Sequence, residues 1–330
     1  VLLDGAKFPR PKPCAGWISM AGMEMLAGLG LATDKLLGQP IEQVTFCSSD
    51  LSRTAQPDIK QPLGHLIDRR TFDAALIAAA RKNGAEFKDR HVVTHIQPME
   101  NGVEVHCHDR KPMLARLLVI ATGVSRQLIE QAGIQMYGDA EPVWTAHIDE
   151  EKPKATRSQS AKVYIIVDAM PGNGFCLAVE RDDRISLTLN GRGEPQQLTQ
   201  KLMEFARELA RTEKLSADLT EVAATATCMP TFPFTALEVD SHVGKHTLVI
   251  GDAGGFHAAA SHEGIYPAMW SAEIAARVIH NARESEYAQD ALMTFDTEWR
   301  LEMAEFLRPP NTDLQLLLPL IFTNQPMADR

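Results

Sequence analysis

Apolar and polar residues alternate in the middle of the chain, which predicts an antiparallel β-sheet. The runs KVYIIVDAM, GFCLAVE and RISLTL lie between residues 143 and 189, and the polar residues Arg181 to Arg184 separate the last two runs. Successive side chains of a strand point to opposite faces, so a period of two indicates strands with a buried face. We expect neighbouring strands here, with a hairpin turn at the polar residues.

Apolar residues spaced three and four apart predict helices in the second half of the chain. The residues that share one face of the segment Gln197 to Arg211 are Leu198, Leu202, Phe205 and Leu209. The segment from Glu263 to Ile279 has a similar amphipathic pattern and follows a glycine-rich turn. Both segments are expected to pack one side against a core.

These patterns together predict an α/β fold. Strand and helix signals alternate over residues 1–138, as in a Rossmann-like nucleotide-binding domain whose first βα unit is missing. The antiparallel strands place a sheet-rich substrate domain at 139–240. Residues 241–330 are expected to return to the first domain and to end in helices.

Composition is that of a globular enzyme and argues against several other classes of protein. The 330 residues are 45% hydrophobic and 23% charged, which is enough for a large core. A net charge of -10 and the lack of any dense Lys/Arg run argue against a nucleic-acid partner. The five cysteines are widely separated, so we expect no metal site, no disulfide framework and a cytoplasmic setting.

The chain has no apolar run long enough for a transmembrane helix. Its most hydrophobic stretch, LQLLLPLIF from Leu314 to Phe322, is too short to span a bilayer. We expect this stretch to pack in the core, and a peripheral membrane contact stays open as an alternative.

An acidic residue stands between a predicted strand and a glycine-rich turn in the run TLVIGDAGG. Gly251 permits a tight exit, and Asp252 then offers a carboxylate that can accept hydrogen bonds from sugar-like hydroxyls. The N-terminus of the next helix suits a phosphate or an electron-rich ring. The pattern is typical of a flavin site, but it also fits an ordinary strand, turn and helix with Asp252 as a cap.

Several segments at both ends of the chain resemble the geranylgeranyl reductase family of FAD-dependent oxidoreductases, which are related to the aromatic hydroxylases. VLLDGAKFPRPKPCAGW is similar to the family's acid-ended strand and its KFPRxKPCGG-like segment. GDAGGF followed by EGIYPAM resembles its second FAD motif, and LIDRRTF its Arg-containing helix start. The resemblance implies a Rossmann-like FAD-binding fold with an antiparallel substrate sheet.

The resemblance also implies where FAD binds. Asp4 would bind the adenosine ribose, Arg69 the phosphates or ribityl oxygens, and the backbone of Val93 the adenine. Asp252 would hold FAD through the second motif. The residues expected beside the isoalloxazine ring are Cys14, Ala15, Gly16, Gly264 and Ile265.

The chain departs from the family at its start. The GxGxxG fingerprint of a dinucleotide fold does not occur, and Val1 to Asp4 correspond to the second strand of that fold. About 30 residues of the first βα unit are therefore expected to be missing from this sequence. Without that unit FAD should bind poorly, which leaves open a flavin-fold remnant that binds a ligand or a partner.

The substrate region departs as well. The family's PxxYxWxFP-like motif corresponds to PGNGFCLAV, in which Gly174 and Cys176 stand where aromatics are expected. His257 and His262 near the second motif are acid or base candidates, although solvated or backbone-bonded histidines are the commoner case. The sequence identifies no catalytic residue.

The resemblance implies an enzyme that acts on a small molecule with FAD as cofactor. The favoured reaction is reduction of a C=C bond in a hydrophobic or isoprenoid substrate, with NAD(P)H or another reductant as electron donor. An FAD-dependent monooxygenase is the alternative, and the two differ in substrate-dependent oxygen consumption. Halogenases carry a WxWxIP-like motif that this chain lacks.

Overall fold

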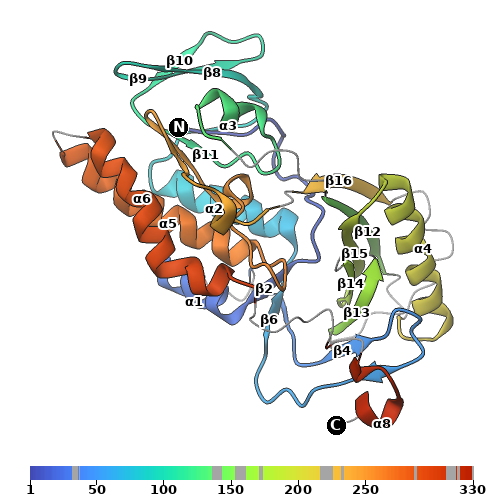
Figure 1. Ribbon diagram of the computed structural model, residues 1–330. Helices are drawn as coiled ribbons and strands as arrows, with labels where there is room; N and C mark the ends of the chain where they lie inside the picture. The colour runs from blue at the N-terminus through green and yellow to red at the C-terminus, as the bar shows by residue number, and fades with distance from the viewer. Residues whose placement is uncertain are drawn as a thin grey trace. The chain divides into compact units, whose positions relative to one another are not determined.

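The computed structural model describes residues 1–31, 36, 38–135, 143–152, 161–170, 174–215, 226–231, 234–285, 288–309, 317 and 320–328 (Figure 1). The chain divides into two compact units, each built from three separate stretches. Unit 1 comprises Val1–Arg10, Ala74–Ala140 and Phe232–Pro309, and unit 2 comprises Pro11–Asp73, Glu141–Thr231 and Pro310–Arg330.

Unit 2 is built on a seven-stranded sheet. In spatial order its strands are β16 (Thr227–Thr231), β12 (Val143–Glu151), β15 (Arg184–Arg192), β14 (Gly174–Glu180), β13 (Lys162–Met170), β4 (Val44–Cys47) and β5 (Thr54–Ala55). Neighbouring strands are antiparallel except for β13 and β4. The predicted antiparallel strands are confirmed, and the polar residues between β14 and β15 form the predicted turn.

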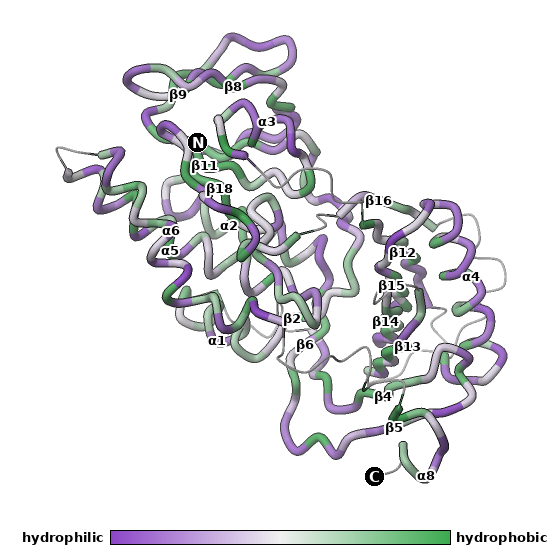
Figure 2. Tube along the Cα trace, in the orientation of Figure 1, coloured by the Kyte–Doolittle hydropathy of each residue, from purple (hydrophilic) through white to green (hydrophobic). Residues whose placement is uncertain are grey.

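Helix α4 (Pro195–Arg211) covers one face of this sheet (Figure 1). Its four predicted core residues are at most 3% exposed and share one cluster with the sheet residues Ala146, Ile166, Cys176 and Leu187. Figure 2 shows hydrophobic residues along the strands, while much of α4 is hydrophilic. The apolar periodicity therefore placed α4 correctly, because burial of one stripe is what stabilises such a helix.

A smaller antiparallel sheet in unit 2 consists of β2 (Trp17–Ser19), β6 (Gly64–Leu66) and β3 (Gln39–Pro40). Helix α1 (Met20–Gly28) follows β2, and α8 (Gln325–Ala328) lies near the end of the chain. Helix α2 (Arg69–Lys82) follows β6, and only its first turn belongs to unit 2.

Unit 1 contains short parallel pairings and two long helices. Strand β1 (Leu2–Leu3) pairs in parallel with β7 (Phe87–Lys88), and β11 (Leu118–Ile120) pairs in parallel with β18 (Thr247–Val249). The remaining elements are β8 (Val93–Met99), β9 (Gly102–Cys107), β10 (Met113–Ala115), β17 (Val243–Gly244), α3 (Gln127–Gln131), α5 (Ile265–Glu284) and α6 (Ala288–Leu307). The predicted α/β fold is confirmed.

Helices α5 and α6 pack side by side and enclose an aromatic core in unit 1 (Figure 1). Phe256, Phe295 and Trp299 are completely buried there together with Ile274 and Leu292. Helix α5 begins at Ile265, two residues later than the apolar pattern predicted, because Gly264 is its N-cap.

The expected functional boundary at 138/139 lies outside the described residues, and so do residues 171–173. Residues 11–73, expected in the FAD-binding domain, belong to compact unit 2, so compactness and the predicted functional division follow different borders. Of the apolar tail, Leu317 and Leu320 are exposed, whereas Phe322 is 5% exposed and packs near Val167. Among the described residues, no helix is long and apolar enough to cross a membrane.

Candidate functional site

The segment after β18 forms a tight glycine turn, defined here as residues 251–255. Strand β18 is buried along its whole length, and Asp252 lies just past its carboxyl end. Gly251 and Gly255 have φ values of 61° and 73°, which side chains rarely tolerate. The predicted exit from strand to acid is therefore present, and it is enforced by the backbone.

The carboxylate of Asp252 lies at the N-terminus of α5. A Cβ placed on Gly264 would be 3.0 Å from Asp252 Oδ1, so glycine leaves space beside this oxygen. Gly264 is the N-cap of the 20-residue helix α5 and supplies no side-chain cap. The structure thus brings together Asp252, Gly264 and Ile265, where a carboxylate lies beside the N-terminal end of a helix dipole that favours anions and electron-rich atoms.

A serine side chain of helix α5 also holds the glycine turn in place. The backbone N–H of Gly251 donates to Ser271 Oγ at 3.1 Å, and Ser271 is fully buried. Because this serine lies on the same helix whose N-terminus faces Asp252, the position of the turn and that of the helix end are linked.

The two candidate histidines lie together after the glycine turn. Their rings are 6.0 Å apart and nearly stacked. Burial lowers the pKa of His257, and the negative charges of Asp252 and Glu238 oppose that shift. Desolvation and the nearby His257 lower the pKa of His262 to about 4. His257 is less exposed than His262 and interacts with the charge of Asp252, so it is the better candidate for a neutral imidazole beside that carboxylate.

Asp4 directly follows β1, and its carboxylate already has partners within unit 1. Its carboxylate accepts from the Ala6 backbone N–H at 2.8 Å and pairs with Arg10 at 3.4 Å. The Asp4 carbonyl accepts from His91, two residues before Val93 at the start of β8. The two predicted adenosine contacts, Asp4 and Val93, therefore lie near each other in unit 1.

In unit 2, Arg69 is committed to its own helix. Its guanidinium forms a two-pronged pair with Asp73 one turn later, at 2.9 and 3.1 Å, and its side chain is 14% exposed. Burial opposes its charge, but Cys14 and Asp73 raise the pKa of Arg69 overall. The structure brings Arg69 near Cys14, and it supplies Asp73 as a partner that was not predicted.

Gly16 is required by a close approach of two backbone segments. Its φ is 78°, and a Cβ there would lie 2.2 Å from the Ile67 carbonyl oxygen. The Ile67 N–H donates to the Gly16 carbonyl at 2.8 Å, and the Gly16 N–H lies 3.3 Å from Cys14 Sγ. Ala15 is 8% exposed and belongs to a buried cluster with Ile41 and Leu66.

One buried residue near this segment was missed. Arg181, assigned from sequence to a polar turn, is 8% exposed and donates through Nη1 to the Ile67 carbonyl at 2.7 Å. Its Nε has no hydrogen-bond partner within the described residues. A turn composed of charged residues gives no sequence signal that one of them is buried.

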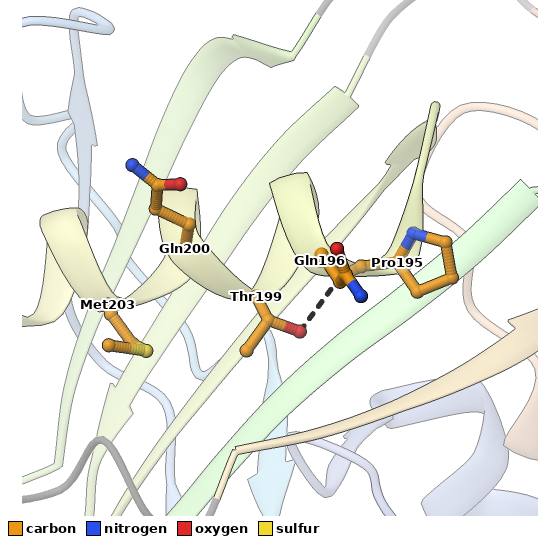
Figure 3. Close-up of a pocket in the computed structure, with 5 residues that line it drawn as sticks. All are labelled: Pro195, Gln196, Thr199, Gln200 and Met203. Atoms are coloured by element: carbon orange, nitrogen blue, oxygen red, sulfur yellow. Dashed lines mark hydrogen bonds between the residues drawn. The ribbon is translucent and has the colours of Figure 1, made fainter.

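The described residues contain a further hollow and no cluster of metal-ligand side chains. A shallow hollow of about 310 Å³ lies at the start of α4 (Figure 3) and is lined by Pro195, Gln196, Thr199, Gln200 and Met203. Its Thr199 hydroxyl donates to the Pro195 carbonyl at 2.9 Å. No predicted site residue lines it. Within the described ranges no three acidic, His or Cys side chains gather as a metal site requires, and the absence of a metal stays a prediction.

Comparison with known proteins agrees with these features. Residues 45–278 match the family described as "FAD dependent oxidoreductase". An uncharacterized protein of Methanosarcina barkeri is 25% identical over 301 residues, which cover 86% of this chain and 69% of that protein.

Solved structures share the fold at low sequence identity. A geranylgeranyl bacteriochlorophyll reductase-like protein of Thermoplasma acidophilum has a TM-score of 0.74 at 14% identity, over 92% of this chain and 77% of its own. A probable FAD-dependent monooxygenase of Pseudomonas aeruginosa, PqsL, has a TM-score of 0.62 at 16% identity, over 99% and 90%. A flavin-dependent brominase has a TM-score of 0.68 at 15% identity, over 97% and 80%.

Proposed function

The chain belongs to the family of FAD-dependent oxidoreductases, and from this premise we propose that it reduces a C=C bond of a small hydrophobic or isoprenoid molecule. The observation that carries the FAD site is the Asp252 carboxylate at the N-terminus of α5, beside the space that Gly264 leaves. We propose Asp4, Val93, Asp252, Gly264 and Ile265 as FAD contacts in unit 1, and Cys14, Ala15, Gly16 and Arg69 in unit 2.

These residues fit FAD in their chemistry. Asp252 and Asp4 accept hydrogen bonds, as ribityl and ribose hydroxyls require, and the amides at the start of α5 favour electron-rich atoms. Bound FAD would supply hydride transfer or oxygen activation. The protein's part is to hold Asp252 through Gly251 and Ser271, and to keep His257 neutral beside it as a group that can move a proton.

The sheet of unit 2 lacks aromatic side chains at the two positions where the family's motif would place them to bind a prenyl chain. Cys176 is completely buried under α4, and a Cβ on Gly174 would lie 2.3 Å from Met170 Cβ. Neither position can offer an aromatic surface, so only half-buried Phe175 remains on the opposite face. Positions 174 and 176 therefore supply no aromatic contact for a prenyl chain, and PqsL is a neighbour of the same fold that was solved with 2-aminobenzoylacetate.

The test loads the protein with FAD and then measures flavin reoxidation, product mass and oxygen uptake. The protein with FAD is reduced with NADPH or dithionite under argon and mixed with a prenyl alcohol or an aromatic acid. Reduction predicts flavin reoxidation without oxygen and a product two hydrogens heavier. Substrate-dependent oxygen uptake would assign a monooxygenase instead, and failure to take up FAD would favour a binding protein. A cytoplasmic location and a peripheral membrane contact remain parts of the proposal that fractionation of cells would check.

A further inference from the structure

His242 in unit 1 is fully buried, and both of its ring nitrogens face oxygen atoms that only accept hydrogen bonds. Nε2 lies 2.8 Å from the Gly254 carbonyl oxygen, and Nδ1 lies 3.3 Å from Oδ1 of Asp296 on α6. A neutral imidazole carries one N–H and could serve only one of these acceptors. Both acceptors are satisfied when the ring carries two protons.

Asp296 is equipped to balance such a buried cation. It accepts from Ser241 Oγ at 2.6 Å, from the His242 backbone N–H at 3.0 Å and from Trp299 Nε1 at 3.2 Å. Although burial opposes its charge, the bonds from His242 and Ser241 lower the pKa of Asp296 to about 2. A buried charge that keeps its partner and its hydrogen bonds can be tolerated in a core.

The surrounding rings also suit a cation. The ring centroids of Phe256 and Trp299 lie 4.8 and 5.1 Å from that of His242, and the centroid of Phe295 lies farther away, at 6.4 Å. An aromatic ring attracts a cation that lies over its face within about 6 Å, a distance that Phe256 and Trp299 meet. Among the charged groups around the ring, Arg300 on α6 also pairs with Asp296, at 3.5 Å, and donates to the Asp240 carbonyl at 2.9 Å. Asp252 lies in the glycine turn.

His242 is connected to the proposed FAD contact by backbone hydrogen bonds. The peptide whose carbonyl accepts from Nε2 carries the Gly255 N–H, which donates to the Asp252 carbonyl at 3.0 Å. A Cβ on Gly254 would lie 2.8 Å from His242 Cδ2, so the ring touches the turn directly. Hydrogen bonds in series strengthen one another, and this series runs from Asp296 to Asp252.

We propose that His242 is a doubly protonated positioning residue that, held by Asp296, fixes the glycine turn and thereby sets how tightly Asp252 holds FAD. This inference rests on the proposed FAD site. His242 would act on FAD through the glycine turn, and its two ring protons would distinguish it from a neutral histidine of the core.

The protonation state is tested without FAD. In the spectrum of the ¹⁵N-labelled protein, His242 should give two slowly exchanging ring N–H signals, assigned by their contacts with Phe256 and Trp299. Asp296→Asn should leave one. A single ring N–H in the wild-type protein would overturn the proposal. Because the wild-type spectrum alone decides this point, a variant that fails to fold does not weaken the test.

The coupling to the turn is tested by FAD titration. His242→Gln and Asp296→Asn should each bind FAD about tenfold more weakly, since each breaks a hydrogen bond to a charged group. The matched control is Gln289→Ala, which removes two other bonds from α6, at 2.9 Å from the His246 N–H and 3.2 Å to the Gly244 carbonyl. It should lower thermal stability without changing FAD affinity. Equal affinity in all four proteins would overturn the coupling, whereas a wild-type protein that binds no FAD would refute the proposed function and leave the ring assignment intact.

Discussion

The glycine turn of unit 1 and the segment around Gly16 in unit 2 were predicted to bind the same cofactor, yet they are built differently. In the first, the carboxylate of Asp252 lies beside a helix N-terminus and beside space that Gly264 leaves. In the second, Arg69 is paired with Asp73, and Gly16 is pressed against Ile67. A glycine in such a motif can therefore be required by a ligand or by the packing of the motif itself, and the atoms around the glycine distinguish the two cases.

The largest effect is expected where packing dominates. Gly16→Ala should destabilise the protein by about 3 kcal/mol or more, because its Cβ would overlap a backbone carbonyl and its φ is positive. Gly30→Ala is the matched control: its φ is 70° and a Cβ there meets nothing within 4 Å, so only about 1 kcal/mol of backbone strain is expected. Urea denaturation measures both. Similar losses in the two variants would show that the approach to Ile67 is unimportant.

At the glycine turn we expect the opposite: a substitution should change FAD affinity more than it changes the free energy of unfolding. Gly264→Ala fills the space beside Asp252 Oδ1 and should weaken FAD binding about tenfold, while the free energy of unfolding hardly changes. Gly28→Ala, at the end of α1 with no atom within 4 Å of the added Cβ, should leave FAD binding unchanged. Fluorescence titration separates them, and undiminished binding by Gly264→Ala would place the cofactor elsewhere.

Arg69 decides whether the unit 2 segment also binds. If its pair with Asp73 is structural, Arg69→Gln should lower stability by about 1 kcal/mol, more than the loss of an exposed pair. Lys201→Gln, which breaks an exposed pair with Glu204 at 3.3 Å, should cost about 0.3 kcal/mol. Asp73→Asn would release the Arg69 guanidinium from its ion pair. Tighter FAD binding by that variant would identify Arg69 as a cofactor ligand with which Asp73 competes.

The smallest effect is a pH dependence that each unit contributes separately. Burial lowers the pKa of His147 in unit 2 and of His257 in unit 1 below the usual 6.5. The unfolded chain therefore binds more protons below pH 6.5, so the free energy of unfolding should fall as the pH decreases from there. His147→Gln and His257→Gln should each flatten this slope in denaturation curves measured between pH 7 and 5. An unchanged slope in both would contradict the burial of neutral imidazoles.

Local sequence patterns predicted much of the fold, because the type and extent of a single helix or strand depend mainly on its own residues. The period of α4, the alternation in β13 to β15 and the exit at Gly251 all follow from neighbours in sequence. The Arg69–Asp73 pair was not predicted, although it too is local, since residues four apart on a helix are adjacent. His242 and Asp296 are 54 residues apart, and Arg181 reaches Ile67 across 114, so their roles depend on tertiary contacts that no local pattern records.

Whether this chain holds FAD at Asp252 and the start of α5 can be measured by titrating the purified protein and its Asp252→Ala variant with FAD while following flavin fluorescence. We expect saturable binding by the wild-type protein and a Kd at least about tenfold higher for the variant, because a hydrogen bond to a charged group is lost. Equal affinity in the two proteins, or no saturable binding by the wild type, would contradict the proposed FAD site.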